Sequence, residues 1–182
     1  MEFTETSIPD VIIIDPVVHE DSRGFLMETW QAERFRAAGI DARFVQDVHS
    51  RSSQGTIRGL HYQLEHPQGK LIRVLRGEVY DVAVDLRRSS PSFGKWVGEM
   101  LSEGNRRLIW VPPGFAHGFQ VLSEFADIEY RMTDFHAPAD ARTIRWDDPD
   151  IAISWRLPAG QRPVLSAQDK DGVPFRKAET YA

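Results

Sequence analysis

The chain has 182 residues, of which 41% are hydrophobic and 27% charged, a balance typical of an ordinary globular protein. This length fits one domain, so we expect residues 1–182 to form a single unit. The net charge of -5 disfavours nucleic acid as a partner, and the lack of cysteine excludes disulfides and thiolate metal sites. With no signal-peptide pattern and no apolar run near the roughly 20 residues of a membrane span, we expect a cytoplasmic protein without membrane contact.

The first quarter of the chain predicts two short strands and one helix. β-Branched residues at 11–15 stop at Pro16 and predict a strand, and residues 25–30 predict another after a turn at 21–24. Residues 31–38 have a helix-forming composition, and a glycine follows where such a helix would end.

From residue 43 the pattern is one of short strands separated by Gly and Pro. A hairpin is predicted for residues 95–101 and 106–111, and the tail from Asp147 is expected to wrap the sheet, with a short helix opening at Ser166. The absence of strand–helix alternation argues against a parallel sheet, so we predict an all-β sandwich or barrel. The other predicted strands are residues 43–49, 56–63, 70–76, 78–87, 117–122 and 126–135.

An arginine, a histidine and a lysine come close together between residues 58 and 70. In residues 58–63 (RGLHYQ), strict alternation places Arg58 on one face of a strand and His61 on the other. Gly59 removes a side chain beside His61, which would let a ligand approach. Imidazole titrates near neutrality, so His61 is the leading candidate for proton transfer, although a lone histidine is more often structural.

Residues 79–86 predict a strand with one apolar face and one face that carries carboxylates. Asp81 and Asp85 share the second face. A histidine base benefits from a carboxylate that fixes its tautomer. The local pattern therefore nominates Asp81 or Asp85 as the partner of His61, unless these groups pair with basic side chains on the barrel wall.

A Pro/Gly turn in residues 112–119 (PPGFAHGF) delivers a second histidine, His117, to the start of a strand. This run resembles the second motif of the cupin superfamily, whose fold is a jelly-roll barrel. Metal-binding cupins have a His-x-His pair where this chain reads His61-Tyr62-Gln63, so one imidazole is missing. The resemblance implies a cupin without a metal, and a metal-dependent isomerase or dioxygenase is the alternative.

Five ordered runs make a closer match: 44–47 (FVQD), 58–63 (RGLHYQ), 69–71 (GKL), 81–87 (DVAVDLR) and 113–119 (PGFAHGF). Together they resemble the dTDP-4-dehydrorhamnose 3,5-epimerase family over nearly the whole chain. The resemblance implies an all-β, cupin-like jelly-roll barrel with a few short peripheral helices. It also implies a homodimer, no metal or other cofactor, and a nucleotide-linked 4-keto sugar as substrate.

The resemblance also implies a role for individual residues. His61 corresponds to the base, Tyr130 to the acid, Asp169 to the partner of His61, and Lys70 to the cation that faces the developing enolate oxygen. Asp169 lies 108 positions beyond His61 (169 − 61), which no local spacing could reveal. The positions implied to contact the substrate are Arg23, Glu28, Gln46, Asp47, Val48, Arg58, Lys70, His117, His136, Ala141 and Gln168.

Four of these positions depart from the family pattern. Val48 replaces an asparagine, His136 an aromatic that stacks on thymine, Ala141 a glutamate and Gln168 a lysine. All four belong to nucleotide or phosphate recognition, so the reaction class is better supported than the substrate. We expect epimerisation of dTDP-4-dehydro-6-deoxy-D-glucose at C3 and C5. The alternatives are an epimerase of another nucleotide sugar that acts at C3 or C5 only, and a cupin that binds sugar nucleotides without catalysis.

Overall fold

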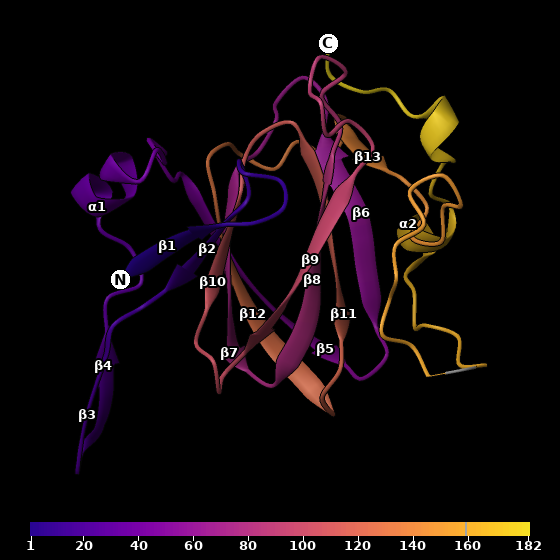
Figure 1. The fold of residues 1–182 in the computed structure, drawn as a ribbon. Helices are drawn as coiled ribbons and strands as arrows, with labels where there is room; N and C mark the ends of the chain where they lie inside the picture. Colours follow the sequence, from indigo (N-terminus) through magenta and orange to yellow (C-terminus); the bar gives the residue numbers. More distant parts are fainter. Residues whose placement is uncertain (159) are drawn as a thin grey trace.

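Two antiparallel sheets face each other in the computed structural model, which describes residues 1–158 and 160–182 (Figure 1). The expected all-β barrel with short peripheral helices is confirmed. One sheet has the strand order β1 (Glu2–Glu5), β2 (Ile12–Asp15), β10 (Leu108–Val111), β7 (Lys70–Arg76), β12 (Phe125–Met132) and β5 (Gln46–Ser53). The other has the order β13 (Ala141–Thr143), β6 (Ile57–Gln63), β11 (Phe115–Val121), β8 (Glu78–Asp85) and β9 (Trp96–Ser102).

The remaining elements lie outside the two sheets. They are the hairpin β3 (Val18–Asp21) and β4 (Gly24–Met27), the helices α1 (Ala32–Ala37) and α2 (Ala167–Lys170), and the 3-10 helix η1 (Phe175–Lys177). The predicted helices at 31–38 and after Ser166 are therefore confirmed. Within residues 1–158 and 160–182, no helix is long and apolar enough to cross a bilayer.

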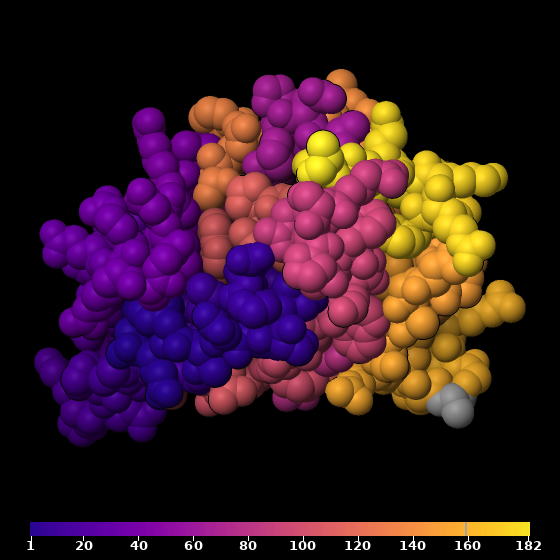
Figure 2. All heavy atoms as spheres, turned by 45° about the horizontal axis from the view of Figure 1, so that its top comes forward, coloured from indigo at the N-terminus to yellow at the C-terminus, as the bar shows by residue number. Residues whose placement is uncertain are grey.

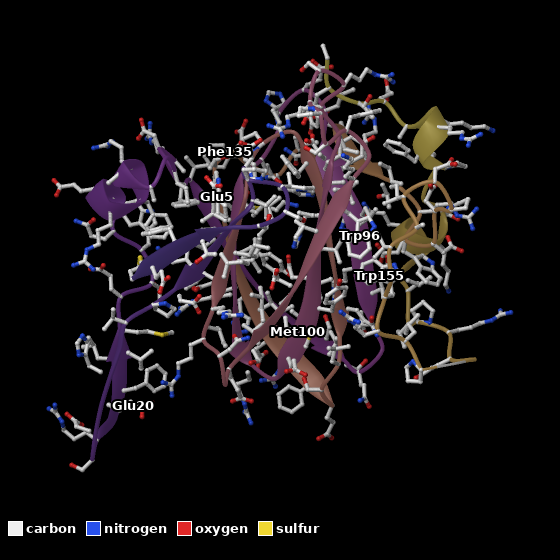
Figure 3. All side chains as sticks on the ribbon, viewed as in Figure 1. Glu5, Glu20, Trp96, Met100, Phe135 and Trp155 are labelled. Atoms are coloured by element: carbon white, nitrogen blue, oxygen red, sulfur yellow. The ribbon has the colours of Figure 1, made fainter. Side chains whose placement is uncertain are left out.

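Three apolar clusters hold the layers together. The first lies between the sheets, beside the cavity described below, with Ile72, Val79, Phe119 and Ile128 among its members. The second lies between the outer face of the five-stranded sheet and the C-terminal segment, and includes Trp96 and Trp155, labelled in Figure 3. The third packs α1 and the N-terminal strands on the six-stranded sheet. The two ends of the chain therefore cover opposite sides of the barrel (Figure 2).

Strand β8 illustrates how the sequence pattern specifies these layers. Tyr80, Val82 and Val84 point outward and pack beneath the C-terminal segment. Asp81 and Asp85 lie on the opposite face, and both are fully buried. Buried carboxylates need hydrogen-bond partners, so this face is where polar networks inside the barrel are expected.

The predicted hairpin of residues 95–101 and 106–111 is wrong. Strand β9 pairs with β8, whereas β10 pairs with β2 and β7 in the other sheet. The turn at 103–105, followed by Arg106 in the left-handed region, carries the chain from one sheet to the other. Both faces of β10 are buried in this position, and burial of apolar surface outweighs the pairing of adjacent strands.

Strict alternation along residues 57–63 is also wrong. His117 and Phe119 of β11 are two residues apart, but they pair with His61 and Arg58, which are three apart. Strand β6 therefore carries a bulge, which turns Arg58 and His61 to the same face. Gly59 has a φ of +133° there, and a Cβ at this position would lie 2.5 Å from the Cα of Gly118. Only glycine fits this close contact.

Three short strands were not predicted, and several predicted strands have different limits; the strand predicted at 25–30, for example, ends at Met27. Residues 2–5, 18–21 and 141–143 form β1, β3 and β13, which are too short and polar for a clear alternating pattern. The strand predicted from 43 begins at Gln46 and continues to Ser53, and the one predicted to 135 ends at Met132.

The β3–β4 hairpin projects away from the barrel at its N-terminal side (Figure 1), and Glu20 on it is labelled in Figure 3. Phe25 and Leu26 are 57% and 70% exposed. Arg106 ties the hairpin to the barrel, because it pairs with Glu20 and stacks over the ring of Phe25 at 4.3 Å. Two exposed large apolar side chains on a projecting hairpin are typical of a surface that contacts another molecule.

Candidate active site

A cavity of about 410 Å³ opens between the two sheets. It contains most of the residues that the sequence singled out, and they come from both sheets. The lining residues are Gln46, Val48, Ser50, Arg58, His61, Tyr62, Gln63, Gln68, Lys70, His117, Phe119, Tyr130, Met132, His136, Ala141 and Gln168.

His61 is paired with Asp169, as the resemblance implied. Its Nε2 lies 2.7 Å from Oδ1 of Asp169, which is 2% exposed. The C-terminal segment makes this possible, because the backbone of Val164 bonds to Gly55 and Ile57 and lays the segment beside β6. Helix α2 then begins at Ala167, and the preceding residue, Ser166, caps it in a capping box with Asp169.

Asp169 is held in its ionised form. Burial alone would raise its pKa, but hydrogen bonds from His61, Ser166 and the Gly59 amide outweigh burial and lower the pKa to about 2. A carboxylate that accepts the Nε2 proton of His61 leaves the lone pair on Nδ1. In this tautomer Nδ1 can accept a proton.

The nomination of Asp81 or Asp85 as the partner of His61 is wrong. Asp81 lies 2.9 Å from Nε2 of His117, with both residues buried. Asp85 instead accepts hydrogen bonds from Arg87, Ser90 and Ser92. In the register between β8 and β11, Asp81 is paired with Phe119 and Ala83 with His117. The carboxylates of β8 therefore contact groups other than His61.

Tyr130 approaches the cavity from the other sheet. Its ring makes edge-type contacts with His117 and a tilted contact with Phe119, each with centroids 6.2 Å apart. Its hydroxyl lies 3.1 Å from Oγ of Ser50. Burial raises the pKa of Tyr130 well above the usual value for a phenol, so the hydroxyl keeps its proton at neutral pH.

Lys70 places an ammonium group on the cavity wall at the start of β7. Burial lowers its pKa to about 8, against the opposing effect of the Asp81 charge. In the described part of the chain, no carboxylate lies within ion-pair distance of Lys70. Its charge is therefore available to an anionic or carbonyl oxygen of a ligand.

Arg58 reaches the cavity from the bulge of β6, and its Nε donates to Oγ of Ser52 at 2.9 Å. Ser50 and Ser52 were not predicted as site residues. The alternation that places Gln46 and Val48 at the cavity continues to them along β5, so this signal was present in the sequence. Phe119, two residues after His117, could have been found in the same way.

The four positions that depart from the family pattern lie together. Val48, His136, Ala141 and Gln168 all line the cavity. The last three also line an adjoining groove of about 420 Å³ at its mouth. Gln168 donates to Oγ1 of Thr143 at 3.0 Å. None of these four positions carries a carboxylate or a lysine.

Three predicted contact residues lie outside the cavity. Arg23 is on the projecting hairpin, where it pairs with Asp21 and is 87% exposed. Glu28 follows that hairpin and pairs with Arg34, and Asp47 lies in a separate hollow beside Arg131. Within one chain, none of the three lines the cavity that contains His61.

The fold and the site define a class of protein: a cupin-like barrel whose cavity is lined by a histidine and a tyrosine from opposite sheets. The sequence profile described as dTDP-4-dehydrorhamnose 3,5-epimerase matches residues 5–177. The chain therefore belongs to the dTDP-4-dehydrorhamnose 3,5-epimerase family, and the resemblance found in the sequence is confirmed.

Individual relatives agree with this assignment. A dTDP-4-dehydrorhamnose 3,5-epimerase of Pseudomonas aeruginosa is 52% identical, over 100% of this chain and 99% of its own length. The crystal structure of the epimerase RmlC of Legionella pneumophila, in complex with dTDP-4-keto-L-rhamnose, has a TM-score of 0.94 and 47% identity, and the match covers 98% of this chain and 94% of that one. ChmJ, a 3'-monoepimerase of Streptomyces bikiniensis, has a TM-score of 0.86 and 31% identity, with 93% and 86% covered. The jelly-roll fold and the epimerase class are confirmed.

The Asp169 carboxylate should stabilise the fold at neutral pH. Its pKa is 3.8 when unperturbed and about 2 in the folded protein, so its contribution is present above about pH 4 and is lost as the pH falls towards 2. We expect Asp169→Asn to lower the free energy of unfolding by roughly 2 kcal/mol at pH 7. Urea unfolding at pH 7, 4 and 2 should show the difference from wild type shrinking as the pH falls.

The matched control is Asp171→Asn, which alters an exposed carboxylate two residues further on. It should change the free energy of unfolding by less than about 0.5 kcal/mol. A difference between wild type and Asp169→Asn that is absent at pH 7, or that does not change with pH, would contradict the assignment.

Proposed function

We propose that the protein converts dTDP-4-dehydro-6-deoxy-D-glucose to dTDP-4-dehydro-L-rhamnose by inverting C3 and C5. The observation that carries this proposal is that His61 and Tyr130 line one cavity from opposite sheets. Inversion requires a base on one face of the sugar ring and an acid on the other, which is what this arrangement supplies.

The proposed reaction uses groups of this chain at each step. His61 takes the proton from the carbon next to the ketone; the electron pair of the C–H bond forms a double bond to C4, and the π pair of the C4 carbonyl moves to its oxygen. Lys70 stabilises the resulting enolate oxygen, whose negative charge is worth more in a site that excludes water. Tyr130 then donates a proton to the same carbon from the other face, and solvent restores both groups.

Asp169 contributes by stabilising the imidazolium that forms when His61 takes the proton. Arg58 and His117, which also line the cavity, are proposed to bind the substrate. The guanidinium of Arg58 suits phosphate oxygens, and the Asp81 contact fixes the ring of His117. We propose one catalytic domain over residues 1–182. The lack of a cofactor or metal, the lack of a nucleic-acid partner and a cytoplasmic location stay predictions.

Proton exchange in D₂O tests the reaction. We expect wild-type enzyme to place deuterium at C3 and C5 of dTDP-4-dehydro-6-deoxy-D-glucose, as followed by NMR. His61→Ala should slow exchange at both carbons by about 10²–10⁴-fold. Tyr130→Phe should retain exchange but lose inversion, because His61 can return a deuteron only to the face from which it took the proton.

His49→Ala is the matched control, because His49 is an exposed histidine that does not line the cavity. Deuterium at one carbon only would contradict inversion at both carbons and would indicate an epimerase that acts at a single carbon. ChmJ is described as such an enzyme, a 3'-monoepimerase. Turnover that is unchanged in both His61→Ala and Tyr130→Phe would contradict the catalytic roles, and turnover abolished by a chelator would favour a metal-dependent reaction.

The charge of Lys70 should set the alkaline limb of the pH profile. Its pKa of about 8 means that the ammonium is present below pH 8 and is lost above it, whereas Tyr130 keeps its proton over this range. We expect kcat/KM to fall about tenfold for each pH unit above 8. Lys70→Arg should be slower than wild type but should lack this limb, since arginine stays charged. An unchanged limb in Lys70→Arg would assign it to another group.

We also propose that the protein is a homodimer in which each β3–β4 hairpin reaches the cavity of the partner. Support comes from Arg23 and Glu28, which match substrate-contact positions but lie outside their own cavity, and from the exposed Phe25 and Leu26 beside them. In an isologous dimer the contact between hairpin and partner cavity would form twice, once for each chain.

Mixing two inactive variants tests this arrangement. Arg23→Ala lacks the hairpin cation and His61→Ala lacks the base, so each alone should have little activity. After unfolding and refolding together, random pairing should restore activity in about a quarter of the sites, because half of the dimers contain one complete cavity of two. No recovery in the mixture, with both variants dimeric by light scattering, would show that Arg23 acts within its own chain or not at all.

A further inference from the structure

The segment 134–137, which carries His136, is held to the cavity wall by side-chain amides. Gln68 donates from Nε2 to the carbonyl of Asp134 at 2.9 Å. Gln63 donates to the carbonyl of Phe135 at 3.2 Å and accepts from the amide of Ala137 at 2.7 Å. Each of these bonds fixes main chain rather than a side chain.

Gln63 acts on both sides of His136 at once. Its carboxamide holds the peptide groups that precede and follow this residue, and the amide of His136 itself donates to Oε1 of Gln46 at 2.8 Å. Gln46 and Gln63 therefore fix three consecutive residues, 135–137, of this surface segment. A segment between strands would otherwise be among the more mobile parts of the chain.

Gln63 has little bonding capacity left for a ligand, although it lines the cavity. It is 3% exposed, and its second Nε2 proton is used by the carbonyl of His66 at 2.8 Å. A carboxamide has two donors and one oxygen, so both donors are committed and the oxygen is engaged. Its role at the cavity is therefore to hold protein groups in place.

The anchor for this contact is rigid. Gln63 belongs to the same strand as His61, two residues further on, and pairs with Ala141 of β13. Its carbonyl accepts a hydrogen bond from the hydroxyl of Tyr181 at 2.5 Å. The strand that carries the proposed base thus also fixes the segment that follows the strand of the proposed acid.

We propose that Gln63 and Gln68 are positioning residues, which set His136 at the cavity mouth so that its ring meets the nucleotide end of the substrate. His136 lines both the cavity and the adjoining groove, where a planar ring can stack on a nucleobase. A ring fixed before binding loses less conformational entropy when the ligand arrives. The inference rests on the proposed function. It deepens that function because it gives Gln63 and Gln68 a part in substrate affinity rather than in the chemical step.

The experiment compares Gln63→Leu, Gln68→Leu and Gln54→Leu, with and without His136→Ala. Gln54 is the matched control, because it also donates to a carbonyl, that of Leu122 at 2.8 Å, but is exposed and does not line the cavity. KM and kcat are measured with dTDP-4-dehydro-6-deoxy-D-glucose, Kd with dTDP, and hydrogen exchange by mass spectrometry over residues 133–140.

We expect Gln63→Leu to raise KM and the Kd for dTDP about tenfold, the effect of one lost hydrogen-bonded contact, with kcat within about threefold of wild type. Gln68→Leu should act in the same direction and more weakly, and it replaces Gln63→Leu if that variant does not fold. Exchange over residues 133–140 should be faster in both and unchanged in Gln54→Leu. In the His136→Ala background, Gln63→Leu should add less than about twofold.

Three results would overturn the inference: unchanged exchange over residues 133–140, faster exchange with unchanged KM and Kd, or a Gln63→Leu effect that persists in full without His136. Failure of wild-type turnover with dTDP-4-dehydro-6-deoxy-D-glucose would instead contradict the proposed function. In that case hydrogen exchange and dTDP binding still decide whether Gln63 and Gln68 position His136.

Discussion

The hydrogen bond between His61 and Asp169 joins the barrel to the C-terminal segment, and the geometry of the cavity depends on it. One oxygen of Asp169 accepts from both the imidazole and the amide of Gly59. The same carboxylate thus fixes the ring of His61 and the bulge that brings Arg58 to its side. Because Asp169 is buried, it must stay fully bonded, and any shift of α2 would disturb the ring and the bulge together.

Two other buried groups of the cavity differ in whether they have a carboxylate partner. Asp81 and His117 satisfy each other deep in the barrel. Lys70 has no carboxylate partner in the described residues, and burial lowers its pKa. An enclosed cation without a fixed anion is costly to the fold, which is consistent with a group kept for a ligand rather than for stability.

The sequence alone could predict the layers of the barrel better than its site. The alternation of residues 79–86 correctly separated an apolar face from a face that carries carboxylates, because period-two patterns report which face of a strand each side chain lies on. It did not indicate that the face with the carboxylates is buried as well. It could not indicate which histidine Asp81 would meet, since that depends on register between strands. The bulge at Gly59 was equally hidden, because one extra residue in a strand leaves no periodic signal.

Long-range contacts were beyond any local pattern. Asp169 reaches His61 from 108 positions away, and only the resemblance to a family suggested it. The first strand of the exposed hairpin was missed for a different reason, since β3 buries almost nothing within one chain. Hydrophobic patterning detects elements that pack on their own core and is weak for those that reach outward.

Because His61 stands on one sheet and Tyr130 on the other, the gap that separates them is a property of the interior packing. Face-to-face sheets lie about 10 Å apart, a spacing set by the side chains between them. Residues such as Ile72 and Ile128, buried between the sheets, therefore act as spacers for the proposed catalytic pair. Exchanging one aliphatic side chain for another in this core would therefore change the distance between His61 and Tyr130, and with it the thickness of the sugar ring that fits between them.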